Sequence, residues 1–287
     1  MIDVASLLIY TTPVALAALG ETIDEKAGSL NIGLEGTMLA GAFFGMATSG
    51  ATGSAWLGLG AGIGVGLILS LIQALFTIRL AIDQVVVGTA LNLLALGLTG
   101  TIFRARYGES GQLLSVPQVP RFAGIDPVVV ALLVLTVLAT WMLARTRFGL
   151  ALRAAGEMPK AAEAAGFSVA RLRTIGLLVS GALGGLAGAY LSLGIAGSFA
   201  ENMTVGRGFV AIAMVTFGRW NPLGVVGASL LVGYAESLQF LFQSRGIAVP
   251  HQLLIALPYL LALGVLVGVG RGTASPAALA IPFRRNG

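Results

Sequence analysis

The sequence is poor in the residues that most enzymes and metal proteins use. It has no cysteine and a single histidine, which excludes disulfides, thiolate metal sites, a cysteine nucleophile and histidine-cluster metal sites. The only lysines, Lys26 and Lys160, lack the glycines and the hydroxyl neighbour of a GxxxxGKS/T phosphate-binding loop. We therefore expect no ATP hydrolysis by this chain itself.

Charged residues are also scarce, at 10% of the chain, whereas soluble domains carry about 25%. Apolar side chains make up 56% of the 287 residues, 41 residues are glycine, and the mean hydropathy is +0.92. This composition excludes an ordinary soluble domain. It predicts an all-α protein, a polytopic membrane helical bundle in which residues 1–287 form a single transmembrane domain.

The apolar runs predict about nine transmembrane helices, because each crossing needs about 20 residues. Residues 36–78 contain no ionisable side chain and are about twice that length, so we expect them to fold back at the small and polar residues 48–54. Residues 206–217 are too short to cross, and residues 218–222 interrupt them, which indicates a broken helix. The remaining expected spans cover residues 4–19 (ended by polar residues 21–26), 84–103, 127–144, 174–193, 223–242 and 252–269.

The longest polar stretch, residues 145–173, predicts how these helices are oriented. It carries six basic residues against Glu157 and Glu163 alone, and cytoplasmic loops collect Lys and Arg. The tail adds a second basic patch over residues 271–285. We therefore expect this loop and the C-terminus to be cytoplasmic and the N-terminus to lie outside. Against the usual bias, this topology places three further arginines outside: Arg104, Arg106 and Arg121.

One polar stretch lies where transporters commonly bind substrate. Residues 28–36 place Asn31 and Glu35 four apart, on one helical face, among glycines that allow the backbone to open. A polar, flexible start to an apolar span is typical of substrate sites, although an interfacial helix cap explains the pattern equally well. Asn92 offers another amide, either for the path or for bonding between helices. We expect residues 28–36 and 206–222 to face one another across the path.

The charged residues of the basic loop 145–173 are spaced as they would be on one face of a helix. Arg153, Glu157, Lys160 and Glu163 recur at this spacing, and Gly166 is placed to end a short helix over residues 161–166. Such a helix suits docking of a partner protein. A solvated loop helix held only by charge pairs is the simpler interpretation.

Several segments resemble a known transporter family. The run NIGLEGTMLAGA at residues 31–42, preceded by LGE at 19–21, is similar to the N-terminal signature of permease subunits of bacterial ABC importers for nucleosides and simple sugars, the branched-chain amino acid and ribose permease superfamily. FGLALRAAGE (148–157), KAAEAAG (160–166) and SGALGGLAGAY (180–190) resemble its central cytoplasmic loop and following span. The NIGLEG form is most similar to the guanosine-type nucleoside uptake branch.

The resemblance implies a non-catalytic permease subunit in the bacterial cytoplasmic (inner) membrane, forming the path for nucleosides in an ATP-driven importer. It implies a second homologous permease in a heterodimer, a cytoplasmic ABC ATPase that binds the ATP and Mg²⁺, and an extracytoplasmic substrate-binding lipoprotein. This chain would hold no cofactor or metal of its own and bind no nucleic acid. Alternatives are a sugar (ribose-like) ABC permease and a stand-alone secondary transporter.

The resemblance implies a role for each of the two polar stretches, residues 28–36 and residues 145–173. The substrate-path residues are Asn31, Glu35 and Asn92. The residues that couple the permease to its ATPase are Arg153, Glu157, Lys160, Glu163 and Gly166.

Overall fold

The computed structural model describes residues 3–108, 115–121, 124, 126–244, 260, 264 and 275–283, and within these ranges the regular elements are all helical. They are α1 (Val4–Ala27), α2 (Leu34–Thr52), α3 (Ala55–Ala74) continued by a π-helical turn η1 (Leu75–Arg79), α4 (Gln84–Tyr107), α5 (Pro127–Arg145), α6 (Arg147–Glu157), α7 (Pro159–Ala164), α8 (Val169–Tyr190) continued by a second π-helical turn η2 (Leu191–Ala196), α9 (Arg207–Phe217) and α10 (Pro222–Ser244).

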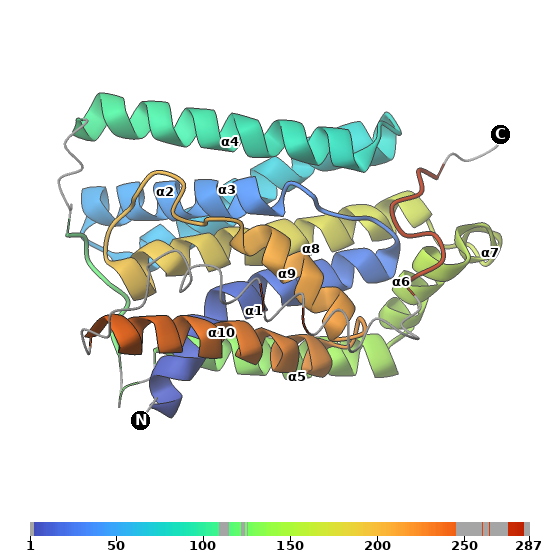
Figure 1. Ribbon diagram of the computed structural model, residues 1–287. Helices are drawn as coiled ribbons and strands as arrows, with labels where there is room; N and C mark the ends of the chain where they lie inside the picture. Colours follow the sequence, from blue (N-terminus) through green and yellow to red (C-terminus); the bar gives the residue numbers. More distant parts are fainter. Residues whose placement is uncertain are drawn as a thin grey trace.

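Most of the long helices run lengthwise in one bundle, with α4 along one edge and α5 and α10 along the other (Figure 1). Five of the described helices are long and apolar enough to cross a membrane: Val4–Ala27, Ala55–Arg79, Gln84–Tyr107, Pro127–Arg145 and Val169–Ala196. The predicted all-helical membrane bundle is therefore confirmed, whereas the count of nine spans stays a prediction. The span expected over residues 252–269 lies outside the described residues except for residues 260 and 264.

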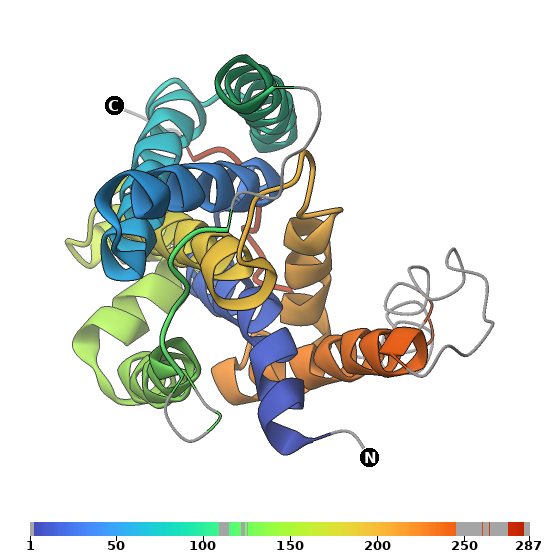
Figure 2. The same cartoon turned by 90° about the vertical axis from the view of Figure 1, so that its left-hand side faces the viewer.

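Helices α1 and α8 form the centre of the bundle. In their most apolar stretches 67% and 61% of the residues are buried, against 33% in each of α4, α5 and the α3–η1 helix. Viewed end-on, α1 and the end of α8 lie in the middle of the other helices (Figure 2). The outer helices expose large apolar side chains such as Leu93 (66%) and Val137 (62%). Such a surface is suited to contact with lipid.

Glycine lets α3 and α8 cross at close range. A Cβ atom added at Gly66 would lie 2.0 Å from the carbonyl oxygen of Gly181, whereas Cβ atoms at Gly60 and Gly64 would have no neighbour within 4 Å among the described residues. The close approach increases the van der Waals contact between the two helices. This contact stabilises their packing inside a membrane, where the hydrophobic effect does not hold helices together. The contact with α8 is thus made by one stripe of α3 that includes Gly62 and Gly66, and Gly58 of the same stripe lies against Gly45 of α2.

The prediction that the first span ends at residue 19 is wrong. Helix α1 continues to Ala27 and buries Glu21, Asp24 and Glu25 inside the bundle. Gly28, with φ at 88°, ends it in the left-handed region that favours glycine. These polar residues do not end the helix, because Ser180, Ser29 and Trp220 bond them inside the bundle.

The polar stretch 145–173 is more helical than predicted. It holds α6, α7 and the start of α8, which begins at Val169 rather than at residue 174. Thr146 and Ser168 cap α6 and α8 through their hydroxyl oxygens, and Pro159 starts α7. The expected short helix is α7, and Gly166 follows it with φ at 86°.

Two expected breaks are confirmed. The chain folds back between α2 and α3, where Gly53 ends α2 with φ at 69°. A second break over residues 218–221 separates the short helix α9 from α10. Helices α6 and α7 lie at one end of the bundle and the N-terminus at the other (Figure 1).

Candidate functional site

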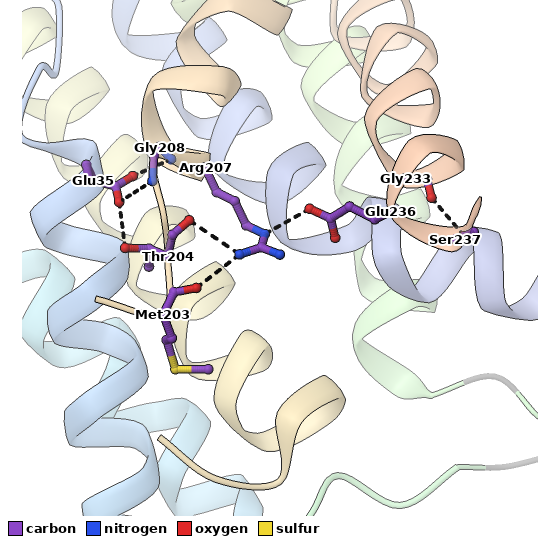
Figure 3. Close-up of polar contacts among 9 residues, drawn as sticks. Glu35, Met203, Thr204, Arg207, Gly208, Gly233, Glu236 and Ser237 are labelled. Carbon is purple, nitrogen blue, oxygen red and sulfur yellow. Dashed lines mark hydrogen bonds and ion pairs between the residues drawn. The ribbon is translucent and has the colours of Figure 1, made fainter. Parts of the chain in front are cut away.

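Glu35 joins the two interrupted segments of the chain. It lies in the first turn of α2, and its carboxylate accepts hydrogen bonds from the Thr204 hydroxyl (2.6 Å) and the Gly206 and Gly208 amides (2.8 and 2.7 Å) (Figure 3). A carboxylate in this position satisfies the free N–H groups at the start of α9 and complements its dipole. A Cβ atom at Gly208 would lie only 2.5 Å from the Glu35 amide nitrogen. The segments 28–36 and 206–222 are thus in direct contact here.

An ion pair ties the same helix to α10. The Arg207 Nε lies 2.9 Å from Glu236 Oε1, and the exposed fractions of these side chains are 23% and 8%. A second guanidinium nitrogen donates to the backbone carbonyl of Met203 at 3.0 Å (Figure 3). The start of α9 is therefore held by two carboxylates, one from α2 and one from α10.

Asn31, in the loop between α1 and α2, is fully buried. Its backbone N–H donates to Glu21 Oε1 (2.9 Å), and its side-chain Nδ2 donates to the Ser180 hydroxyl (3.0 Å). Ser180 in turn donates to Glu21 Oε2 at 2.7 Å. The amide oxygen of Asn31 has no hydrogen-bond partner among the described residues. This acceptor is therefore buried without its hydrogen bond in the described structure.

The loop between α1 and α2 is held by side-chain amides instead of helical hydrogen bonds. Asn92 donates to the Ile32 carbonyl (2.9 Å) and accepts from the Gly36 amide (2.7 Å). Gln84 accepts from the Leu30 amide at 2.7 Å. These amides satisfy backbone groups that the interrupted helix leaves free, as a membrane interior requires. The structure uses Asn92 to hold this loop.

Three buried acids of α1 were missing from the predicted site. Glu21 bonds Asn31 and Ser180 as described, Asp24 accepts from the Ser29 hydroxyl, and Glu25 accepts from Trp220 Nε1 at 2.5 Å. Their spacing of three and four residues, which places all three on one helical face, is the signal that could have found them. They extend the polar cluster from residues 28–36 toward the break between α9 and α10.

The expected coupling residues lie on α6 and α7, at one end of the bundle. Glu157, Lys160 and Gly166 are exposed, and Arg153 and Glu163 are half-buried. Glu157 accepts a hydrogen bond from the Ala277 amide in the C-terminal segment at 3.3 Å. Glu157 and Lys160 thus present exposed charges, whereas the Nε atom of Arg153 is buried without a hydrogen-bond partner among the described residues.

Helix α6 packs closely against the loop that carries Asn31. A Cβ atom at Gly156 would lie 2.4 Å from the Lys26 carbonyl oxygen and 3.2 Å from the Gly28 amide nitrogen. The C-terminal segment 275–283 bridges the same place, because the Ala278 amide donates to Gly156 (2.8 Å) and the Ala280 amide to Gly28 (3.2 Å).

Arg173 of α8 fastens this segment to the bundle. Its guanidinium donates to the carbonyls of Ile281 (2.7 Å) and Ala278 (3.2 Å), and only 3% of the residue is exposed. Helix α6, the end of α1 and the start of α8 therefore meet at one point. Helix α6 is thus in backbone contact with Gly28, the first residue of the segment 28–36.

Comparison with known proteins gives a consistent result. Residues 4–270 match the family described as "Branched-chain amino acid transport system / permease component". The guanosine ABC transporter permease protein NupQ of Bacillus subtilis is 35% identical, over 98% of this chain and 96% of the relative. The nucleoside ABC transporter permease protein NupC of Lactococcus lactis is 37% identical, over 92% and 91%. The putative glucose ABC transporter permease protein TsgC13 of Haloferax volcanii is 35% identical, over 83% and 76%.

Proposed function

The chain belongs to the family of branched-chain amino acid transport system permease components, and from this premise we propose that it forms the nucleoside path of an ATP-driven importer. One observation carries the choice of substrate: two relatives named for guanosine or nucleoside transport match more than nine tenths of the chain. The importer would lie in a bacterial cytoplasmic membrane, with residues 1–287 as one transmembrane domain.

A sugar is the second candidate substrate. The archaeal relative named as a putative glucose permease is as similar in identity as the guanosine permease, although over less of the chain. Nucleosides and sugars share ribose-like hydroxyl groups, which an amide such as that of Asn31 recognises as donor and acceptor.

The proposed path runs along the contact between residues 28–36 and residues 206–222. Asn31 supplies the free acceptor, Glu35 holds the start of α9, and Asn92 holds the loop that carries both. Passage of a substrate requires α9 to move away from α2, which breaks the three hydrogen bonds of Glu35. We therefore assign Glu35 and Asn92 to the walls of the path and Asn31 to substrate contact.

The proposed coupling element is the surface of α6 and α7 formed by Arg153, Glu157, Lys160, Glu163 and Gly166. A partner ATPase that binds ATP and Mg²⁺ would dock there and move α6. The junction of Gly156 with Lys26 and Gly28 supports this route, because backbone in direct contact transmits a displacement without a compressible side chain between. The complex would also hold a second, homologous permease and an extracytoplasmic substrate-binding lipoprotein.

Uptake by a strain that lacks this chain tests the proposal. Labelled guanosine, adenosine, uridine, ribose and glucose are supplied separately to the deletion strain and to the strain carrying the gene again. Nucleoside uptake that disappears on deletion and returns with the gene supports the proposal. Loss of glucose or ribose uptake alone would assign the chain to sugar transport.

A further inference from the structure

A cleft of about 1030 Å³ opens on the side of the bundle, between the end of the α3–η1 helix and the start of α8. Phe283 of the C-terminal segment and Glu163 of α7 complete its wall. The cleft shares no lining residue with segments 28–36 or 206–222. It is therefore separate from the proposed path.

The lining of the cleft changes from apolar to cationic along its length. Leu71, Leu75 and Ile175 line one part, and they are 53%, 46% and 41% exposed. They continue the apolar outer surface of the bundle, so this part of the cleft is open to lipid. Arg79 and Arg171 line the other part, against the single carboxylate of Glu163.

The cationic part lies at the ends of two candidate membrane spans. Arg79 is the last residue of one apolar span, and the span that starts at Val169 begins beside Arg171. Ser168, which caps α8, lines the cleft together with Ala170 of the first turn. The N–H groups and the dipole of such a first turn favour an anion. Two guanidinium groups and a helix start thus favour a negative group at headgroup depth.

We propose that this cleft binds an anionic phospholipid. Its acyl chain lies along Leu71, Leu75 and Ile175, and its phosphate lies at the part lined by Arg79 and Arg171. Basic pockets between transmembrane helices are suited to anionic headgroups, and the apolar part requires a long hydrocarbon rather than a small anion. Because Glu163 of α7 lines the same cleft, the lipid would contact the surface proposed for ATPase docking.

Thermal unfolding and retained lipid test this site on the full chain purified in detergent with its accompanying subunits. The probes are phosphatidylglycerol, phosphatidylcholine with the same acyl chains, and inorganic phosphate. A bound ligand stabilises the folded state, so we expect phosphatidylglycerol to raise the unfolding temperature more than phosphatidylcholine does and phosphate to leave it unchanged. Equal effects of the two lipids, or an equal effect of phosphate, would overturn the proposal.

Two variants locate the effect. In Arg79→Gln/Arg171→Gln, affinity for phosphatidylglycerol should fall about 25-fold, because each basic side chain near a membrane surface contributes roughly fivefold. Ile175→Trp fills the apolar part and should reduce retained lipid without removing a charge. Arg145→Gln/Arg147→Gln is the matched control, since it removes two exposed arginines that do not line the cleft.

Two results would contradict the proposal, one from the control variant and one from the attached ATPase. If the control loses the lipid response as fully as Arg79→Gln/Arg171→Gln does, the response is a surface charge effect and the proposal fails. The proposal also fails if Arg79→Gln/Arg171→Gln releases the ATPase while its phosphatidylglycerol response is unchanged, because the cleft would then hold a protein segment.

Discussion

Glu35 illustrates how a single side chain positions a helix in this protein. Its carboxylate receives three hydrogen bonds from the chain around the start of α9, about 170 residues further along the sequence. Hydrogen bonds to an ionised group are roughly twice as strong as neutral ones. The charge on Glu35, and not only its shape, should therefore hold α9 in place.

Replacing Glu35 by glutamine tests this role, because Glu35→Gln keeps the shape and removes the charge. We expect the free energy of unfolding to fall by about 1–2 kcal/mol and substrate uptake to fall with it. The matched control is Asp83→Asn, since Asp83 also caps a helix but is exposed, and asparagine caps equally well. Unfolding in detergent and uptake in cells are measured for both. Equal responses of the two variants would show that Glu35 has no special role.

Asn31 is tested against its own hydrogen-bond partner. Asn31→Leu and Ser180→Ala each remove the bond between Nδ2 and the hydroxyl, worth about 1 kcal/mol, but only Asn31→Leu removes the free amide oxygen. If that oxygen contacts substrate, Asn31→Leu abolishes uptake whereas Ser180→Ala keeps most of it, with both proteins assembled. A loss of uptake and stability that is the same in both variants would assign Asn31 a structural role alone.

At the scale of the elements, α6 is packed against the end of α1 with no side chain between them. Gly156→Ala inserts a methyl group 2.4 Å from the Lys26 carbonyl oxygen, so α6 must move away. Overpacking of this kind costs about 1–3 kcal/mol. We expect the ATPase to remain attached while its stimulation by substrate is lost.

The measurement is ATP hydrolysis with and without substrate, together with co-purification of the ATPase. Gly64→Ala serves as the control, because the added methyl group meets no atom within 4 Å in the part of the chain that the structure describes. Normal substrate stimulation in Gly156→Ala would contradict the proposed route from α6 to residues 28–36.

The breaks between helices were predictable from the sequence because they depend on local chemistry. Gly53 ends α2 and Gly166 follows α7 through conformations that favour glycine, as the residue types indicate. The end of the first helix was not predictable in this way. Glu21 and Glu25 are buried because Ser180 and Trp220, which lie far along the chain, bond them. The partners of Glu35 are equally remote, so the sequence identified the residue but not what it holds.

At the scale of the whole molecule, the bundle separates two ends. Helices α6 and α7 and the C-terminal segment 275–283 meet at one end, and the turn between α2 and α3 lies at the other (Figure 1). Two of the three arginines predicted outside have partners from distant parts of the chain, since Arg104 pairs with Glu201 at 3.5 Å and Arg121 donates to the Gly194 carbonyl at 2.8 Å.

Cysteine labelling tests the predicted orientation, since the chain has no cysteine of its own. Ser168→Cys and Thr52→Cys place one exposed thiol at each end of the bundle. An impermeant maleimide on intact cells should label Thr52→Cys, and should label Ser168→Cys only after the cells are opened. The reverse pattern would invert the topology and remove α6 and α7 from contact with a cytoplasmic ATPase.

The central claim is that this permease moves nucleosides with energy from ATP, and reconstitution tests it most directly. The complete complex is placed in liposomes with ATP trapped at the side of α6 and α7, and the binding lipoprotein with labelled guanosine is added at the other. The account predicts guanosine accumulation that requires both ATP and the lipoprotein and that a proton or sodium gradient does not replace. Accumulation driven by such a gradient without ATP would contradict the account and identify a secondary transporter.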